Sequence, residues 1–471
     1  MQNQDPFNKN RLTTNLSRRD AIKLMGISPI AASVLASTAG SSIAEASEDV
    51  KGKIVIVGGG AGAIMALSRL QRAIKNPDIT IIAPNEVHLY QPGQVFVGAG
   101  LMQVEDLRIE NKDYIDKEGV TWIKDEVKTF DPDNNILVTR AGQEVKYDYM
   151  VMAAGIQYHY EHIKGLSIDD IGTNGITSVY LNDLEKGTAH GATATWKWFN
   201  ELKEMAKMKK PKVIYTQPNT PIKCGGAPQK MLYLSADYLR QEGLSADYQF
   251  VASIGKLFSL PAIDKALHEV QDGFDTVTNK FQHHLKAIDV KAKKATFLHA
   301  YEVAEYDADF DTTEMVSKTE TIVMDYDFIH VVPPMSPPDA VKNSTLVGKS
   351  GWLEVDKHSL QHKKYKNVFG IGDICGIPMG KTGGSARHHG PILTENLLSV
   401  MQGKKPKASF DGYTVCPIKT EYGKIIMAEF NYDGPAPTLP LAFDKPRWIW
   451  WAFDLYMLKP MYKYLMLTGR F

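Results

Sequence analysis

The apolar residues of the chain gather first in short runs that alternate with helical stretches. Residues 53–57 form a β-branched run that ends in glycines, and residues 79–83 form a second apolar run. A third run, 148–152, ends in the small residues Ala153, Ala154 and Gly155. Runs of this kind are typical of strands buried on both faces of a parallel sheet. The pattern therefore predicts an α/β fold in which helices are layered on a parallel sheet.

A second α/β block is predicted from about residue 212. Residues 212–216 and 250–253 are predicted strands, and the Lys-, Ala- and Glu-rich patch 197–210 is predicted to be a solvated helix and its connection. Near residues 327–332 the chain is expected to return to the first sheet. The predicted domains are a discontinuous first unit of 47–155 and 325–400, a second unit of 156–324, and a C-terminal region of 401–471.

Residues 1–46 have the pattern of a secretory signal peptide. Arg18 and Arg19 precede an apolar, small-residue run at 24–39, and an A-x-A cleavage pattern follows at 44–46. The arginine pair favours the twin-arginine export route, which predicts a periplasmic protein. An uncleaved membrane anchor is the alternative, and Gly26 and Pro29 disfavour it because they weaken the apolar run.

Composition and charge narrow the classes of function. The chain has 471 residues, and Lys+Arg and Asp+Glu each total 54, so the formal net charge is zero. This balance disfavours nucleic acid as a partner, because nucleic-acid-binding domains are basic. The three cysteines, Cys224, Cys375 and Cys416, form no CxxC pair. We therefore expect neither a disulfide framework nor a structural metal site nor a c-type haem.

A glycine-rich turn follows the first predicted strand. Gly58, Gly60 and Ala63 fit the pattern G-x-G-x-x-G/A. The first glycine permits the tight turn, the second lets backbone approach a pyrophosphate, and the small third residue allows close helix–strand packing. The helix N-terminus would then offer N–H groups to the phosphates. The second strand lacks the usual terminal acidic residue, so either Glu86 from the loop, or Asn85 with backbone groups, is expected to hold a ribose.

Two further segments favour a flavin over a nicotinamide. Gly372 and Asp373 follow a predicted strand, as in two-domain flavoproteins, where such a pair lies beside the ribityl–phosphate arm of the flavin. Ala154–Gly155 is similar to the A-T-G segment of that group.

A second glycine fingerprint is missing after the strand at 212–216. Pro218 and Pro221 occupy that turn and remove N–H donors needed for phosphate binding. NADH is therefore not expected as the electron donor.

Together these segments resemble the sulfide:quinone oxidoreductases, particularly the branch that includes the mitochondrial enzyme. The resemblance covers the chain from about residue 52 to the end and is most specific at 88–92, 97–100, 218–230, 351–373, 381–382 and 411–417. It implies an enzyme with two Rossmann-like dinucleotide-binding-type domains and a C-terminal amphipathic membrane-associating region. It also implies an FAD site formed by Gly58, Gly60, Ala61, Ala63, Gln91, Ala154, Gly155, Gly372, Asp373, Lys381 and Thr382.

The resemblance further implies a redox-active cysteine pair, Cys224 and Cys375. Ile374 separates Cys375 from Asp373, whereas the mitochondrial branch places its cysteine directly after the aspartate. Cys416 is interpreted as a small buried hydrophobic residue without chemistry. The implied mechanism is attack of hydrosulfide on a Cys224–Cys375 bridge, which gives a persulfide and a thiolate that reduces FAD.

Thiolates of this kind are favoured by a positive environment. The candidate cations are Lys223, Lys230, Lys381 and Arg387. Gln and Lys occupy positions 229 and 230, where some family members have a proton-carrying glutamate. His388 or His389 is therefore the candidate proton carrier, because histidine titrates near neutral pH.

The C-terminal stretch 448–466 suggests contact with a membrane. It contains three of the seven tryptophans, which favour the membrane interface. Asp454, Lys459 and Pro460 break it into pieces too short to span a bilayer, so it is predicted to lie on one leaflet. The expected acceptor is membrane quinone, with residues 330–335 as a candidate quinone channel.

Several alternatives remain open from the sequence. Electrons could pass instead to a cytochrome c, and a type II NADH:quinone dehydrogenase or a flavin sensor without turnover is a further alternative. The aromatic C-terminus disfavours the cytochrome, the missing glycine fingerprint disfavours NADH, and the retained cysteines disfavour the sensor. The sulfur acceptor and a homo-oligomeric assembly also stay open.

Overall fold

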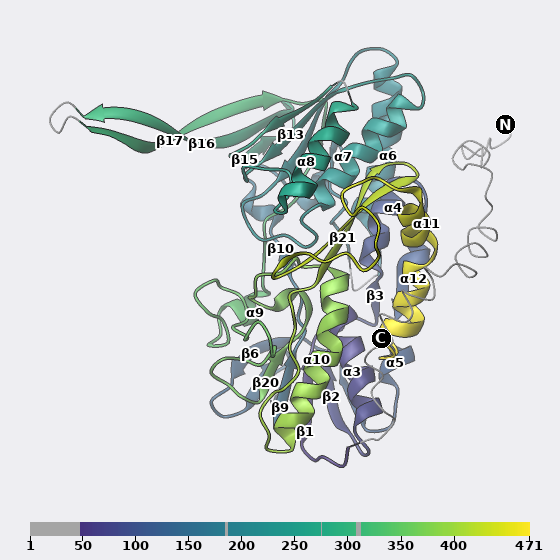
Figure 1. Cartoon of the computed structure of the whole chain (residues 1–471), viewed down its shortest axis with the longest axis vertical. Helices are drawn as coiled ribbons and strands as arrows, with labels where there is room; N and C mark the ends of the chain where they lie inside the picture. Colours follow the sequence, from purple (N-terminus) through teal and green to yellow (C-terminus); the bar gives the residue numbers. More distant parts are fainter. Residues whose placement is uncertain (1–47, 184–186, 275, 308–311) are drawn as a thin grey trace.

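The computed structural model describes residues 48–183, 187–274, 276–307 and 312–471. The predicted signal peptide, 1–46, lies outside these residues. Two parallel five-stranded sheets, one in each half of the molecule in Figure 1, confirm the prediction of an α/β fold with two Rossmann-like units.

The first sheet has the strand order β20-β9-β1-β2-β5, and all its strands run parallel. Alternate residues of its central strand face two separate cores. Ile54 and Ile56 pack against helices, whereas Val55 and Val57 pack against a small antiparallel sheet. This burial on both faces explains the continuous apolar run. The bounds are β1 Lys53–Val57, β2 Asp78–Ile82, β5 Val120–Ile123, β9 Tyr149–Met152 and β20 Val368–Gly370; the helices are α3 Ala61–Ala73, α5 Lys112–Ile115 and α10 Gly383–Met401; the small sheet is β6 Val127–Asp131, β7 Ile136–Thr139 and β8 Glu144–Lys146.

The second sheet, also parallel, has the order β11-β18-β12-β13-β14. Its strands are β11 Ile176–Thr177, β12 Lys212–Gln217, β13 Asp247–Ala252, β14 Val277–Lys280 and β18 Phe328–His330. Val213 and Tyr215 face the helices α6 His190–Ala206, α7 Ala227–Arg240 and α8 Pro261–Asp272. The helix predicted over 197–210 begins earlier, at His190, and it buries Trp198, Phe199 and Leu202, so one face belongs to the core.

The return to the first sheet expected at 327–332 is wrong. Strand β18 pairs with β12 and β11 of the second sheet, and the next strand of the first sheet is β20. Both strands are short and fully buried. An apolar run of this length does not encode which of two buried sheets it joins, so the pattern alone could not make the assignment.

An antiparallel hairpin projects from the second domain (Figure 1). It is formed by β16 Lys294–Asp307 and β17 Thr312–Asp325, and β15 His283–Asp289 pairs with the base of β16. At that base Leu285 and Phe297 cover the face of the second sheet that the helices leave free. Farther out, Met315 is 62% exposed.

The C-terminal region bridges the two domains. Strand β21 Thr414–Glu421 contacts both α7 and α10, and it pairs with β22 Lys424–Asn431, which pairs with β23 Gly434–Pro435. The helical segments α11 Trp448–Tyr456, α12 Leu458–Met461 and the π-helical turn Tyr462–Met466 run beside α4 Gln94–Gly98 and β3 Val87–Leu89 in Figure 1. Among the described residues, no helix is long and apolar enough to cross a bilayer.

Short elements complete the chain. They are β3 Val87–Leu89 paired with β4 Arg108–Glu110, β10 Gln157–Tyr158 paired with β19 Met335–Ser336, α4 Gln94–Gly98 and α9 Asp339–Lys342, and the 3₁₀ turns Gln91–Gly93, Val104–Leu107, Tyr160–His162, Ile168–Asp170 and Gly372–Ile374.

Candidate active site

The glycine turn after β1 has the shape of a phosphate cradle. Gly58 has φ +121°, and a Cβ atom there would lie 2.4 Å from the carbonyl oxygen of Ala153, so only glycine fits. At Gly60, the N-cap of α3, a Cβ atom would meet no protein atom within 4 Å. Ala61 begins the helix and Ala63 is fully buried. The turn thus leaves open space beside the N–H groups of a helix start, which fits a dinucleotide pyrophosphate.

Two other predicted segments reach the same edge of the sheet. Val57, Met152 and Gly370 are neighbours in the strand register, so the loops that follow β1, β9 and β20 lie side by side. Gly155 and Gly372 both have positive φ, +68° and +76°. A Cβ atom at Gly155 would meet nothing within 4 Å. The loops that carry Ala154, Gly155, Gly372 and Asp373 therefore start at the same sheet edge as the glycine turn.

Two asparagines hold the outer side of the glycine turn. The amide of Asn111 donates to the carbonyl oxygens of Gly59 and Asn85 at 3.0 and 2.8 Å, and Asn85 donates to Val87 O at 2.9 Å. Glu86 instead points outward and pairs with Lys124, which lowers the pKa of its carboxyl. The structure therefore brings Asn85, and not the Glu86 side chain, to the cradle.

The predicted residues Lys381, Thr382 and Gln91 hold the loops together. The Lys381 ammonium donates to the carbonyl oxygens of Asp373 and Cys375 at 2.6 and 3.1 Å and lies 3.6 Å from the ring centroid of Trp352. Burial lowers the pKa of Lys381 to about 8. The Thr382 hydroxyl caps α10 by accepting from Ser385 N at 3.2 Å.

Gln91 reaches the second domain through Lys223. Its side-chain oxygen accepts a hydrogen bond from the Lys223 ammonium, which also lies 4.7 Å from the ring centroid of Tyr158. Burial lowers the pKa of Lys223 to about 8, while the nearby Asp373 opposes this. Met335, from the segment considered as a quinone channel, accepts from Lys223 N at 3.4 Å. The two domains therefore meet at this lysine.

The structure pairs Cys224 with Cys416. Their sulfur atoms lie 3.1 Å apart, and the Lys230 ammonium lies 3.0 Å from the sulfur of Cys224. Cys224 stands just before α7 with φ +54°, and Cys416 lies within β21. Cys224 is half-buried, whereas Cys416 is 1% exposed.

The predicted partner Cys375 is elsewhere, so the structure corrects the predicted pair. Its sulfur packs against the first sheet in a core that includes Leu353 and Val355, and a Cβ atom at Gly370 would lie only 2.9 Å from it. Burial raises the pKa of Cys375 to about 12. The interpretation of Cys416 as an inert hydrophobic residue is corrected as well, because its sulfur is the one that Cys224 meets.

The electrostatics differ between the two paired cysteines. The hydrogen bond from Cys416 and the charge of Lys230 hold the pKa of Cys224 well below its usual range. Cys416, which donates that bond and is buried, has its pKa raised. The thiolate of the pair therefore resides on Cys224, and the nearby thiolate raises the pKa of Lys230.

The other predicted cations and proton carriers lie apart from the cysteines. Arg387 donates to His388 at 2.7 Å and faces the ring of Phe471. Burial lowers the pKa of His388 to about 4 and that of His389 to about 3, so both rings are neutral near pH 7. His389 accepts from Gly372 N at 3.1 Å, which makes it a support of the loop after β20.

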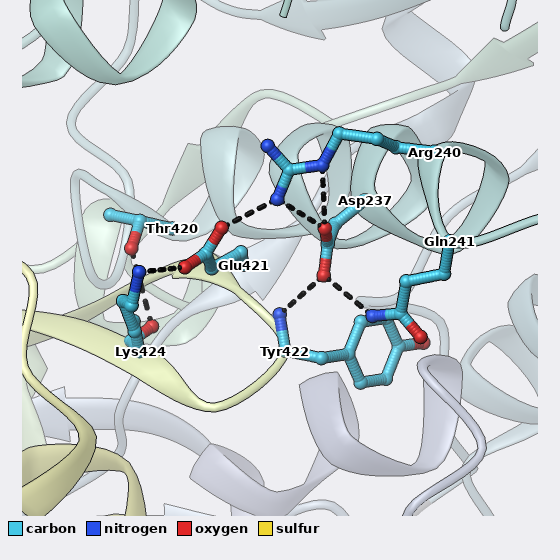
Figure 2. A network of polar contacts seen from close by, with 7 residues as sticks. All are labelled: Asp237, Arg240, Gln241, Thr420, Glu421, Tyr422 and Lys424. Carbon is cyan, nitrogen blue, oxygen red and sulfur yellow. Dashed lines mark hydrogen bonds and ion pairs between the residues drawn. The ribbon is translucent and has the colours of Figure 1, made fainter. Parts of the chain in front are cut away.

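A polar network joins α7 to the β21–β22 turn (Figure 2). Buried Asp237 accepts from Tyr422 N and from the Gln241 amide, each at 2.9 Å. Arg240 bridges Asp237 and Glu421, with 2.5 Å contacts to both carboxylates. Since Cys224 precedes α7 and Cys416 is in β21, this network fixes the two elements that carry the sulfur pair.

Comparison with known proteins agrees with this architecture. The family model described as "Pyridine nucleotide-disulphide oxidoreductase" matches residues 52–190. A mitochondrial sulfide:quinone oxidoreductase of Dictyostelium discoideum is 38% identical over 424 residues, covering 89% of this chain and 86% of that protein. The mouse protein of the same name is 35% identical over 425 residues, covering 88% and 86%. The chain belongs to the sulfide:quinone oxidoreductase family. The predicted resemblance is confirmed.

A solved sulfide:quinone oxidoreductase shares the fold. The crystal structure from Aquifex aeolicus is 19% identical, with a TM-score of 0.65 over 89% of this chain and 91% of that one. In this chain the family's segment 411–417 contains Cys416 next to Pro417. That family segment is the feature of the sequence that could have identified Cys416 as the partner of Cys224. A cysteine in a buried strand cannot be recognised as reactive from the sequence, because its reactivity depends on which residue lies next to it in the fold.

Proposed function

We propose that this protein is a sulfide:quinone oxidoreductase that oxidises sulfide at the Cys224–Cys416 pair and passes two electrons through FAD to a quinone. The observation that carries the proposal is the 3.1 Å contact between the two sulfur atoms with the Lys230 ammonium beside Cys224. A disulfide requires about 2.05 Å between its sulfurs, so a small side-chain movement closes the bridge.

The asymmetry of the pair sets the direction of the first step. Hydrosulfide attacks the sulfur of Cys416; a new S–S bond forms there, the Cys224–Cys416 bond breaks, and its electron pair stays on Cys224. A thiol of lower pKa leaves faster, and Lys230 stabilises this leaving thiolate. The sulfide sulfur loses two electrons and becomes the outer atom of a Cys416 persulfide, while the disulfide gains two electrons.

The cycle then has to restore the disulfide. A sulfur-accepting nucleophile, such as a thiolate or a second hydrosulfide, removes the outer sulfur and leaves a thiolate on Cys416. Two electrons must leave the cysteine pair when the bridge re-forms. When bound, FAD would supply the two-electron acceptor for that oxidation and the link to quinone.

The FAD site is supported by the cradle at the edge of the first sheet. Gly58, Gly60 and the α3 N-terminus would hold the pyrophosphate, with Ala61 and Ala63 permitting close approach. The loops carrying Ala154–Gly155 and Gly372–Asp373 adjoin it. Lys381, Thr382 and Gln91 shape the surrounding loops through the contacts described above.

The C-terminal segments support delivery of quinone from a membrane surface. Trp448 and Tyr464 are 51% and 60% exposed, and Lys459 and Lys463 belong to the same C-terminal helical segments. Aromatic rings and snorkelling lysines suit the interface of one leaflet. Together with the twin-arginine pattern of 1–46, these features favour a location on the periplasmic face of the membrane.

An anaerobic stopped-flow experiment tests the proposal. The purified protein is mixed with sulfide while flavin absorbance is followed, and then with a soluble quinone. Bleaching by sulfide and recovery with quinone are expected. Recovery with cytochrome c but not with quinone would favour the cytochrome-linked alternative, and bleaching by NADH would favour the NADH:quinone dehydrogenase. Absence of bleaching by sulfide would refute the proposed activity.

A further inference from the structure

A buried ion pair lies next to the cysteine site. The Lys419 ammonium, in β21 three residues after Cys416, contacts a carboxylate oxygen of Asp454 in α11 at 2.5 Å. Their side chains are 2% and 0% exposed. The sequence predicts that Asp454 interrupts the apolar C-terminal stretch, but its side chain points inward. Its second oxygen, Oδ1, is buried with no hydrogen-bond partner in the described part of the chain.

Stability does not account for such a pair. Removing two charges from water costs several kcal/mol per ion, and the mutual attraction often fails to repay that cost. The unpartnered Oδ1 of Asp454 adds a further cost, because a buried acceptor without a donor is destabilising. A pair buried under these conditions points to a use for its charges.

The charges that surround the pair belong to the sulfur site. Lys230 contacts Cys224 at 3.0 Å and is within electrostatic range of Asp454, and Lys419 is one of the cations that favour the Cys224 thiolate. Lys230 comes from α7, Lys419 from β21 and Asp454 from α11. Further groups that interact electrostatically with members of this cluster are Cys416, Lys223, Asp373, Tyr180 and Tyr90.

The inner charges do not cancel. Two lysines, Lys230 and Lys419, oppose one carboxylate, Asp454, so one positive charge is left over. Lys223 and Asp373 carry opposite charges and do not change this balance. The excess disappears when Cys224 becomes a thiolate. With the disulfide closed there is no thiolate, and the positive charge is then available to an approaching anion.

We propose that the Lys419–Asp454 pair leaves the cysteine site with an excess of one positive charge. A single anion, the Cys224 thiolate or an incoming hydrosulfide, neutralises that excess. Lys419 supplies the second cation, and Asp454 limits the excess to one charge and holds the ammonium in place. Both are positioning residues that act through Cys224. The identity of the incoming anion rests on the proposed function, whereas the effect on Cys224 does not.

Single substitutions of the two partners test this proposal because their effects have opposite signs. Lys419→Met removes the second cation, so the pKa of Cys224 should rise by about one unit. Asp454→Asn enlarges the positive excess, so the pKa of Cys224 should fall. The double variant keeps Lys230 alone and should titrate near the wild type. The measurement is the pH dependence of iodoacetamide alkylation at Cys224 in the reduced protein, quantified by mass spectrometry.

Control variants separate charge from packing. Lys424→Met removes a cation from the same hairpin, but that lysine is exposed and paired with Glu421, so Cys224 should titrate as in the wild type. Lys419→Arg keeps the charge and should do the same. If Lys419→Met does not fold, Asp454→Asn alone still tests whether the pKa of Cys224 falls when the positive excess grows.

Changes of the same sign in both single variants, or no change in either, would overturn the proposal and leave the pair a structural feature. A lower melting temperature with unaltered Cys224 titration would overturn it in the same way. Because alkylation requires neither sulfide nor quinone, failure of the proposed enzymatic activity would not affect this result.

Discussion

The sulfur atoms of Cys224 and Cys416 lie 3.1 Å apart although 192 positions separate the two residues in the chain. One belongs to the turn before α7 in the second domain, and the other to the C-terminal sheet that bridges both domains. Gly226 lets these elements approach, because a Cβ atom there would lie 3.1 Å from the Cys416 sulfur. The chemistry of the pair therefore depends on docking between two units of the fold.

Serine substitutions distinguish the observed cysteine pair from the predicted one. Cys224→Ser and Cys416→Ser should each slow flavin reduction by sulfide by at least about 10³-fold, a conservative expectation because removal of a covalent nucleophile can cost about 10⁶-fold. Cys375→Ser should retain most of the rate, because that sulfur lies in a separate apolar core. Stopped-flow measurement at saturating sulfide gives all three rates. Loss of activity in Cys375→Ser together with an active, folded Cys416→Ser would instead support the Cys224–Cys375 pair.

Removal of the Lys230 charge should move the pH dependence of Cys224. The wild-type thiol has a pKa well below its usual range, so its thiolate persists as the pH falls below the ordinary thiol value of about 8.5. In Lys230→Met that pKa should rise, so alkylation at pH 7 should slow and recover as the pH is raised. Lys230→Arg, which keeps the charge, should largely restore the profile. An identical profile in Lys230→Met would show that this lysine does not stabilise the thiolate.

The network of Figure 2 should affect both stability and the cysteine pair. Asp237→Asn removes the charge that Arg240 contacts and replaces an acceptor oxygen with an amide, so we expect a loss of about 1–3 kcal/mol in the free energy of unfolding. Slower closure of the Cys224–Cys416 bridge under oxidised glutathione should accompany it. Urea unfolding and thiol counting provide the two readouts.

A matched surface substitution gives the control for that experiment. Glu204→Gln breaks the exposed Lys207–Glu204 pair in α6, and such pairs contribute less than about 1 kcal/mol. It should leave bridge closure unchanged. Equal effects of the two substitutions would show that the Asp237 network does not position the sulfurs.

The sequence was informative wherever a local pattern determines a local structure. The run 53–57 coincides with β1, and the glycine turn has the backbone that its motif requires. The sequence pattern does not predict the hairpin β16–β17. Most of the hairpin projects from the core, so its alternating residues do not form a strongly apolar face. The cysteine pair and the Lys419–Asp454 pair depend on contacts between α7, β21 and α11, which no local pattern encodes.

Gly60→Ala isolates cofactor binding from folding. Gly60 has an ordinary φ of −96°, and a Cβ atom there would meet no protein atom within 4 Å, so the variant should keep the wild-type melting temperature in the absence of flavin. If the open space receives a pyrophosphate, the added methyl group should lower flavin occupancy markedly.

Gly58→Ala should instead impair folding itself, because its Cβ atom would lie 2.4 Å from Ala153 O. Gly273→Ala, at the end of α8 with φ −75°, serves as the control and should bind flavin normally. Full flavin occupancy in Gly60→Ala would mean that the phosphates lie elsewhere.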